Sequence, residues 1–220
     1  MQPDLDPAAA QAQLEKLVTA ALSLPGWRWA DDLRRLGRET LALREQAILL
    51  EIGCFFGRSA LVLAGALQMR GSGILHCIDP FDASGDAFST PHYTRLLAAQ
   101  GGGSMRDHVT AMLEQHGLLH RVQLHTARAV EVDCDAFGTL DLLLLDGDQS
   151  RAGAQAAYGH WAPKLRAGGL LVVGNSAVRA YEADHDGQAM VVETCLVRDG
   201  FTNIERGDTT FARAGEQRHP

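Results

Sequence analysis

The 220-residue sequence contains no apolar run long enough to cross a membrane. A membrane-spanning helix needs about 20 consecutive apolar residues, whereas the longest runs here, such as residues 140–146, have the length of a strand. Residues 1–6 are acidic and lack the apolar core of a secretory signal peptide. We therefore expect a cytoplasmic protein with no membrane partner.

The sequence also lacks an excess of basic residues. Its formal net charge is −7, and no run rich in lysine or arginine offsets this charge locally. Proteins that bind nucleic acids attract the phosphate backbone with positive surface charge. The charge therefore argues against a nucleic acid partner.

Cysteine is scarce and widely spaced. The four cysteines are Cys54, Cys77, Cys134 and Cys195, and no two of them form the CxxC pair that is typical of zinc sites and redox motifs. Three of them lie in apolar stretches. Buried free thiols are therefore favoured over disulfides or a zinc site.

What the sequence does have is the composition of a globular domain. Its residues are 46% hydrophobic and 21% charged, and its length allows one well-buried core but is short for two. The first 45 residues contain two amphipathic helical patterns, at 8–24 and 31–43, with a break between them. We expect a helical cap over residues 1–45 and a main domain over residues 46–214.

From residue 47 onward, short apolar runs alternate with helical patterns, which is typical of βα units and a parallel sheet. The expected strands cover residues 47–53, 74–80, 122–126, 140–146 and 170–175. The expected helices cover residues 58–69, 91–100, 104–116, 151–165 and 187–199. The first, fourth and fifth strands are almost continuously apolar, as central strands covered on both faces should be.

The end of the sequence has a different pattern. Residues 202–206 and 209–213 alternate apolar and polar side chains around Gly207 and Asp208, which predicts an antiparallel β-hairpin. The expected fold class is α/β, a Rossmann-like three-layer sandwich. It has a seven-stranded, mostly parallel sheet, an antiparallel carboxyl-terminal hairpin and an amino-terminal helical cap.

The segment after the first expected strand has the features of a cofactor-binding loop. Residues 51–57 read EIGCFFG and lead into a helix, so Gly53 and Gly57 fall where the backbone turns sharply and approaches a ligand. Asp79 ends the second strand, 22 residues after Gly57, where a carboxylate accepts hydrogen bonds from the hydroxyls of a ribose. The two features together predict a cofactor that contains a ribose.

This loop departs from the pattern of dinucleotide-binding proteins. It begins with the acidic Glu51, and Phe55 stands where a glycine would let a pyrophosphate approach the helix. A cofactor with a cationic amino acid and a sulfonium, but no phosphate, suits a carboxylate at this position better.

The sequence resembles the class I S-adenosylmethionine-dependent methyltransferases, in the group of small-molecule-modifying bacterial methyltransferase domains. The resemblance spans most of the chain. The matching stretches are the cap around residues 25–27, EIGCFFGRSA at 51–60, IDPFD at 78–82, LLLLDGDQS at 142–150 and WAPKLRAGGLLVV at 161–173. The resemblance implies S-adenosylmethionine as cofactor. The residues that it implies for the cofactor site are Glu51, Gly53, Gly57, Ser59, Asp79, Phe81 and Asp146, with Gly53 and Gly57 at the methionine end and Asp79 at the ribose.

Two departures from the family pattern concern a metal site. Relatives commonly read DGDH after the fourth strand, whereas this chain has Gln149 in place of the histidine, and Gly174 replaces an acid after the fifth strand. The related metal-dependent O-methyltransferases bind a divalent ion at these strand ends. The ligands here would be Asp146 and Asn175, with Asp148 or Asp184. Because the acid is missing at Gly174, we expect no metal, and a divalent metal is the less favoured alternative.

Asp146 is the first catalytic candidate, because ligands bind outside the carboxyl ends of the strands in such sheets. Its alternative role is to cap the helix that follows. His185, in a polar loop after the fifth strand, is preferred as general base over His92 and His160. Asn175 completes the predicted catalytic set.

The predicted reaction is methyl transfer from S-adenosylmethionine to an oxygen of a small molecule, with nitrogen as the less favoured acceptor atom. One alternative is a nicotinamide-dependent oxidoreductase, which Glu51 and Phe55 disfavour. Another is a protein with a non-catalytic methyltransferase fold that acts as a binding or regulatory subunit.

Trp27 and Trp29 on the cap either form a wall of the acceptor pocket or, as is favoured, anchor the cap. A homodimer is left open, and the fold alone does not identify the acceptor.

Overall fold

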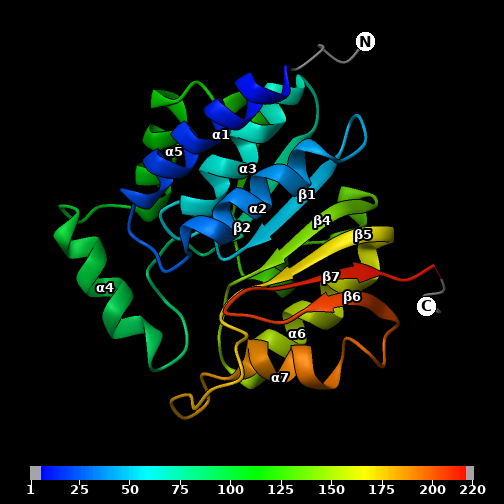
Figure 1. Ribbon diagram of the computed structural model, residues 1–220. Helices are drawn as coiled ribbons and strands as arrows, with labels where there is room; N and C mark the ends of the chain where they lie inside the picture. Colours follow the sequence, from blue (N-terminus) through cyan, green and yellow to red (C-terminus); the bar gives the residue numbers. More distant parts are fainter. Residues whose placement is uncertain (1–5, 217–220) are drawn as a thin grey trace.

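A computed structural model describes residues 6–216 of the chain (Figure 1). Within this range, one seven-stranded sheet carries helices on both faces. The strands are β1 (Ile48–Ile52), β2 (Ile74–Asp79), β3 (Val122–Thr126), β4 (Leu140–Leu145), β5 (Leu165–Val173), β6 (Phe201–Glu205) and β7 (Thr210–Ala214). The α-helices are α1 (Pro7–Leu22), α2 (Ala30–Leu41), α3 (Arg58–Arg70), α4 (Ser89–Ala99), α5 (Met105–Gln115), α6 (Arg151–Trp161) and α7 (Gly187–Thr194).

β1 and β4 lie at the centre of the sheet, whose strand order is β3-β2-β1-β4-β5-β7-β6. Strands β1 to β5 are parallel, and β7 runs antiparallel to both β5 and β6. In register, Glu51 of β1 lies between Cys77 of β2 and Leu144 of β4. The predicted Rossmann-like fold, including the antiparallel carboxyl-terminal hairpin, is confirmed.

The central strands are apolar because both of their faces are covered. Side chains alternate between the two faces of a strand. Leu142 and Leu144 of β4 belong to the core under α1, α2, α3 and α5, whereas Leu143 and Leu145 pack in a second core with α6 and α7. Figure 1 shows these two helical layers on opposite sides of the sheet.

The two amino-terminal helices pack against α3. Asp6 caps α1 by accepting a hydrogen bond from the backbone N–H of Ala8, with Pro7 at the first helical position. The buried leucines of both helices share one core with those of α3, among them Leu14, Leu17, Leu33, Leu36, Leu61 and Leu63. The connection between α1 and α2 is thereby held against the carboxyl-terminal edge of the sheet.

The predicted helix over residues 151–165 is too long. α6 ends at Trp161, and Ala162–Lys164 form a short 3₁₀ turn before β5 begins at Leu165. Pro163 explains the end, because proline has no N–H to donate to the preceding turn of the helix. The glycines at 168 and 169 therefore belong to an irregular start of β5, not to the end of a helix.

α7 is also shorter than the predicted 187–199. It ends at Thr194, and turns follow it up to Gly200, whose φ of 76° lies in the left-handed region. No helix in the described part of the chain is both long and apolar enough to span a bilayer.

Candidate active site

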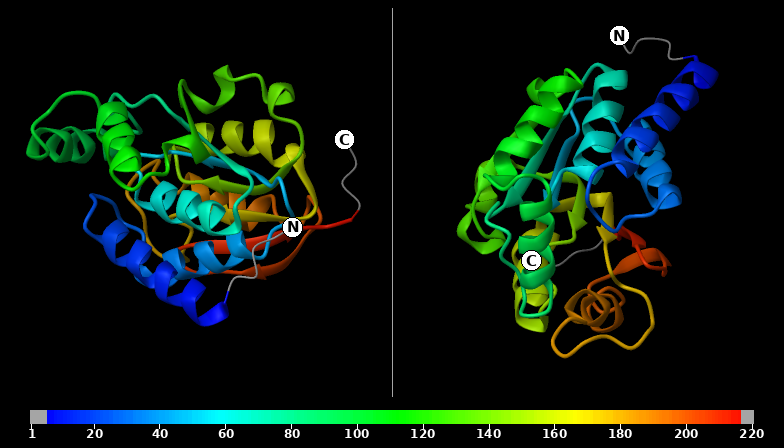
Figure 2. Two further views of the ribbon diagram at one scale, coloured as in Figure 1. Left: turned by 90° about the horizontal axis from the view of Figure 1, so that it is seen from above. Right: turned by 90° about the vertical axis from the view of Figure 1, so that its left-hand side faces the viewer.

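A cavity of about 630 Å³ opens at the carboxyl ends of the parallel strands, the edge at which such sheets bind ligands. Its walls come from the connection between α1 and α2, from the loops after β1, β2, β4 and β5, and from the turn between β6 and β7. The second view of Figure 2 looks toward this edge, with α4 in front.

Most of the predicted site residues meet in this cavity. Six of them line it: Gly53, Ser59, Asp79, Asp146, Asn175 and His185. The other three, Glu51, Gly57 and Phe81, are buried outside the lining. Any effect of these three on a ligand would pass through their neighbours.

Asp79 organises one end of the cavity. Its carboxylate accepts hydrogen bonds from two backbone N–H groups, that of Phe55 at 2.9 Å and that of Phe81 at 2.6 Å. Burial raises the pKa of the Asp79 carboxyl above its usual range, although these hydrogen bonds oppose the shift. One side chain thus joins the loops after β1 and β2, and its oxygens retain lone pairs for a ligand.

Gly53 allows the loop after β1 to pass close to the end of β4. Its φ is 86°, and a Cβ at this position would lie 2.3 Å from the carbonyl oxygen of Asp146. A residue with a side chain would therefore be strained and would push the two loops apart. This close approach explains the first glycine of the predicted cofactor loop.

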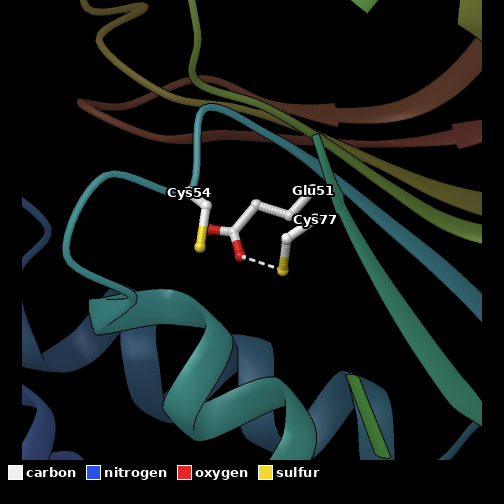
Figure 3. A group of neighbouring side chains, drawn as sticks. All are labelled: Glu51, Cys54 and Cys77. Carbon is white, nitrogen blue, oxygen red and sulfur yellow. Dashed lines mark hydrogen bonds between the residues drawn. The ribbon is translucent and has the colours of Figure 1, made fainter. Parts of the chain in front are cut away.

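Glu51 lies behind this loop and faces two thiols (Figure 3). Its carboxylate accepts a hydrogen bond from the hydroxyl of Ser59, and the Cys77 Sγ donates to it at 3.5 Å. Burial raises the pKa of Glu51 to about 7, against the opposing hydrogen bond from Ser59. In this structure the Glu51 carboxylate is held by contacts inside the core, and its contact with the cofactor stays a prediction.

The ligand atoms of Glu51, Cys54 and Cys77 lie within 4.8 Å of one another, a spacing that a metal ion could bridge. The pKa of Cys54 is raised to about 11, and burial raises the pKa of Cys77 well above its usual value. Metals bind the thiolate and not the thiol. These buried, protonated thiols are better explained as core residues, and all four cysteines of the chain are free.

Asp146 follows β4 and pairs with Arg28 from the connection between α1 and α2. The Arg28 guanidinium donates one hydrogen bond to Asp146 Oδ2 and another, of 2.9 Å, to the hydroxyl of Thr209. Burial raises the pKa of the Asp146 carboxyl, while the charge of Arg28 opposes this shift. The alternative role of Asp146 as a helix cap is wrong, because Ser150 caps α6 by accepting a hydrogen bond from the N–H of Gly153.

Asn175 lies at the centre of a hydrogen-bond network across the cavity. Its Nδ2 donates to Gln149 Oε1 at 3.1 Å and faces His185 Nε2 at 3.3 Å. Its Oδ1 accepts a hydrogen bond from the guanidinium of Arg179. Gln149, which replaces the family's histidine, therefore holds Asn175 in place.

His185 has an acidic partner that the sequence reading missed. Its Nδ1 lies 3.2 Å from Asp86 Oδ1, and its ring contacts that of Phe88, with the ring centroids 4.7 Å apart. Asp86 is 8% exposed and also accepts a hydrogen bond of 2.6 Å from the hydroxyl of Ser89. Nothing in the local sequence around Asp86 points to a histidine 99 residues further on, so this pairing had no signal in the sequence.

Comparison with known proteins gives the family. Residues 50–176, more than half of the chain, match the family described as a methyltransferase domain. The chain belongs to this family. The expected resemblance to class I S-adenosylmethionine-dependent methyltransferases is confirmed, and with it the expectation of a methyltransferase enzyme that uses this cofactor.

Several solved structures share the fold of this methyltransferase at low sequence identity. The O-methyltransferase NovP has a TM-score of 0.66 and 15% identity, over 94% of this chain and 98% of that one. Cofactor-bound Rv0187 from MTB has a TM-score of 0.62 and 18% identity, over 98% and 94%. An O-methyltransferase from Bacillus cereus, in complex with SAH, has a TM-score of 0.61 and 14% identity, over 96% and 93%. No curated protein matches the sequence.

Aromatic side chains form the outer wall of the methyltransferase cavity. Trp27 and Trp29 line it and are 59% and 65% exposed, which supports the less favoured role as walls of the pocket. The Trp27 ring lies 5.2 Å from that of Phe55 and 5.5 Å from that of Tyr93, measured between centroids. Phe88 also lines the cavity and is 41% exposed. Such exposed rings offer flat apolar contacts to a ligand.

Proposed function

We propose that this methyltransferase transfers the methyl group of S-adenosylmethionine to an oxygen atom of a small molecule, with nitrogen as the less favoured acceptor atom. The observation that carries the proposal is the shared cavity. It joins Asp79, at the end of β2, to Asp146, Asn175 and His185, at the ends of β4 and β5. In-line methyl transfer requires donor and acceptor to meet in one protected space.

The cofactor end of the cavity is proposed to lie between Gly53 and Asp79. The Asp79 carboxylate has the charge and the free lone pairs to accept hydrogen bonds from ribose hydroxyls. Gly53 keeps the backbone close to the ligand without a side chain in between. S-adenosylmethionine, when bound here, supplies a methyl group that its sulfonium already activates.

His185 is proposed to accept the proton of the acceptor hydroxyl. A carboxylate such as Asp86 only accepts hydrogen bonds, so the neutral His185 ring carries its proton on Nδ1, and the lone pair on Nε2 faces the Asn175 amide nitrogen at 3.3 Å. The acceptor hydroxyl would take the place of this amide contact at Nε2. The O–H proton would pass to Nε2 as the oxygen forms its bond to the methyl carbon and the carbon–sulfur bond breaks. Asp86 holds the ring and stabilises the imidazolium that forms.

The size and the charge of the molecule support a small acceptor. A cavity of about 630 Å³ falls in the range of small-molecule sites, and the net charge of −7 disfavours nucleic acid. We propose that the cap over residues 1–45 contributes part of the outer wall, and that the domain over residues 46–214 contributes the cofactor site and the general base.

The test combines cofactor binding with a search for the acceptor. S-adenosylmethionine and S-adenosylhomocysteine should each raise the melting temperature, while NADH should not. A library of phenols, alcohols and amines is then incubated with protein and S-adenosylmethionine, and mass spectrometry detects the gain of one methyl group. Stabilisation by NADH alone would favour the oxidoreductase, and cofactor binding without transfer to any acceptor would favour a non-catalytic role.

A further inference from the structure

We propose that Arg28 is the resident cation of the acceptor end of the cavity, in the place of a divalent metal, and that it binds the acceptor oxygen during transfer. The inference rests on the proposed function. It predicts a metal-independent reaction that favours acceptors whose oxygen carries negative charge in the transition state.

The first argument is that Arg28 is built into the site. It is 8% exposed and lines the cavity. Its guanidinium donates to Asp146 and Thr209, and its backbone carbonyl accepts a hydrogen bond of 3.1 Å from Arg58. Thr209 in turn donates to Asp32 Oδ2 at 2.7 Å. The charge is thus fixed between the cap, the end of β4 and the turn before β7.

The second argument is that two of the oxygens that a divalent ion would need already contact guanidinium groups. Asp146 Oδ2 and Asn175 Oδ1 each accept a hydrogen bond from a guanidinium, that of Arg28 and that of Arg179. The two further acids considered for the site are engaged as well. Asp148 Oδ1 accepts from the N–H of Ser150, and Asp184 Oδ1 from the N–H of Arg151, both at 2.9 Å.

A divalent ion between Asp146 and Asn175 would therefore lie beside two positive charges, in a cavity where such repulsion is poorly screened. These residues do not fit a divalent metal. They do fit an arrangement in which a guanidinium supplies the positive charge.

The third argument comes from Gly174. A Cβ at this position would lie 2.2 Å from Asp146 Oδ1 and 2.5 Å from its Cγ. The Asp146 carboxylate that pairs with Arg28 therefore occupies the space that a side chain at position 174 would need. The absence of an acid at position 174 therefore leaves the space in which Asp146 pairs with Arg28.

The chemical consequence concerns the acceptor. A guanidinium donates hydrogen bonds to an oxygen that becomes negative, without needing a change of its own protonation state. Hydrogen bonds from the guanidinium lower the barrier most when the acceptor hydroxyl is acidic, as in a phenol. The oxygen of such a hydroxyl becomes negative before the new carbon–oxygen bond is complete. The exposed rings of Trp27, Trp29 and Phe88 would hold the flat ring of such a phenol.

The experiment compares Arg28→Gln with Arg28→Lys and with a matched control, Arg34→Gln. Arg34 lies on the same cap and pairs with Glu15 and Asp31 outside the cavity. For a phenol identified by the mass spectrometry screen, Arg28→Gln should lower kcat/KM about 100- to 1,000-fold. Arg28→Lys should recover part of this loss, and Arg34→Gln should behave like wild type. The affinity for S-adenosylhomocysteine should change less than about threefold in all three variants.

A second variant separates catalysis from folding. Arg28→Gln alone leaves the partly buried Asp146 carboxylate without its partner, which lowers stability. The double variant Arg28→Gln/Asp146→Asn removes both charges and should recover melting temperature but not turnover. Recovery of both would show that the pair is only structural and would overturn the proposal, as would an Arg28→Gln variant with wild-type turnover.

Whether the protein binds a divalent metal can be tested without an acceptor molecule. Millimolar Mg²⁺ or Mn²⁺ should leave the melting temperature of the wild-type protein unchanged, and turnover should survive EDTA. A metal-induced rise of several degrees, or activity that EDTA removes and Mg²⁺ restores, overturns the proposal. If S-adenosylmethionine does not bind, the proposed function fails, whereas the metal titration still reports on Arg28.

Discussion

The carboxylate of Asp86 lies 3.2 Å from the imidazole of His185, although 99 residues separate the two in the sequence. The first residue belongs to the loop after β2 and the second to the loop after β5, and both are largely buried. The charged groups around this pair include Asp184, Asp186 and Arg179. The pair is the most direct candidate for proton removal from an acceptor hydroxyl.

Asp86→Asn should reveal this role. Asparagine keeps the oxygen that accepts the cap hydrogen bonds of α4 but removes the negative charge beside His185. Turnover at neutral pH should fall about tenfold or more, because the imidazolium that forms on proton transfer loses its charged partner. Ser89→Ala is the control, because it removes a hydrogen bond to Asp86 and leaves its charge. Wild-type turnover in Asp86→Asn would show that Asp86 only supports the start of α4.

Asp79 should determine cofactor affinity. Asp79→Asn removes one of the two acceptor oxygens and the negative charge, so the affinity for S-adenosylmethionine should fall by on the order of 1.5 to 3 kcal/mol. Isothermal titration calorimetry measures this change. Asp82→Asn is the matched control, since Asp82 is exposed three residues further on and bonds only to the N–H of Ser84 among the hydrogen bonds of the described chain. Equal affinities in both variants would show that Asp79 does not contact the cofactor.

The sheet could be predicted because its signals are local. The central strands β1 and β4 are short apolar runs, and the glycines and Asp79 mark where β1 and β2 end. Parallel strands place such ends together at one edge, so Asp79 and Asp146 could be assigned to one cavity without knowledge of any side-chain contact.

The partners of the catalytic candidates could not be predicted in this way. Arg28 and Asp86 lie in connections whose course depends on tertiary packing, and neither has a spacing that points to Asp146 or His185. The sequence also favoured a buried role for Trp27 and Trp29, because tryptophan is apolar and local patterns do not report exposure. The end of α6 was misplaced because the effect of Pro163 was overlooked.

Glu51 should make the stability of the protein depend on pH. Its pKa in the folded protein is about 7, against an ordinary value of 4.5. Stability that comes from the protonated carboxyl is therefore fully present below pH 4.5 and is lost as the pH rises to about 7. Glu51→Gln mimics the protonated form, so above pH 7 it should be more stable than wild type by on the order of 3 kcal/mol.

Urea unfolding between pH 5 and 8 measures the difference between Glu51→Gln and wild type. Glu205→Gln is the control, because hydrogen bonds and charge from Arg35 lower the pKa of Glu205 below its ordinary value of 4.5. The contribution of Glu205 is lost only below that pH, so the stability curve of Glu205→Gln should stay parallel to that of wild type between pH 5 and 8. Parallel stability curves for Glu51→Gln and wild type would mean that Glu51 is ionised in the core at neutral pH.

Gly174→Ala should disturb Asp146 without removing any charged group. The added Cβ would lie 2.2 Å from Asp146 Oδ1, so the carboxylate must move away from Arg28 or the loop after β5 must shift. Overpacking of this kind costs about 1 to 3 kcal/mol of stability, and turnover should fall with it. Gly159→Ala on α6 is the control, because a Cβ there meets no atom within 4 Å.

A double variant isolates the contact between Gly174 and Asp146. In an Asp146→Ala background the overlap is gone, so Gly174→Ala should cost little further stability. Additive losses in the double variant would show that Gly174 and Asp146 do not compete for the same space.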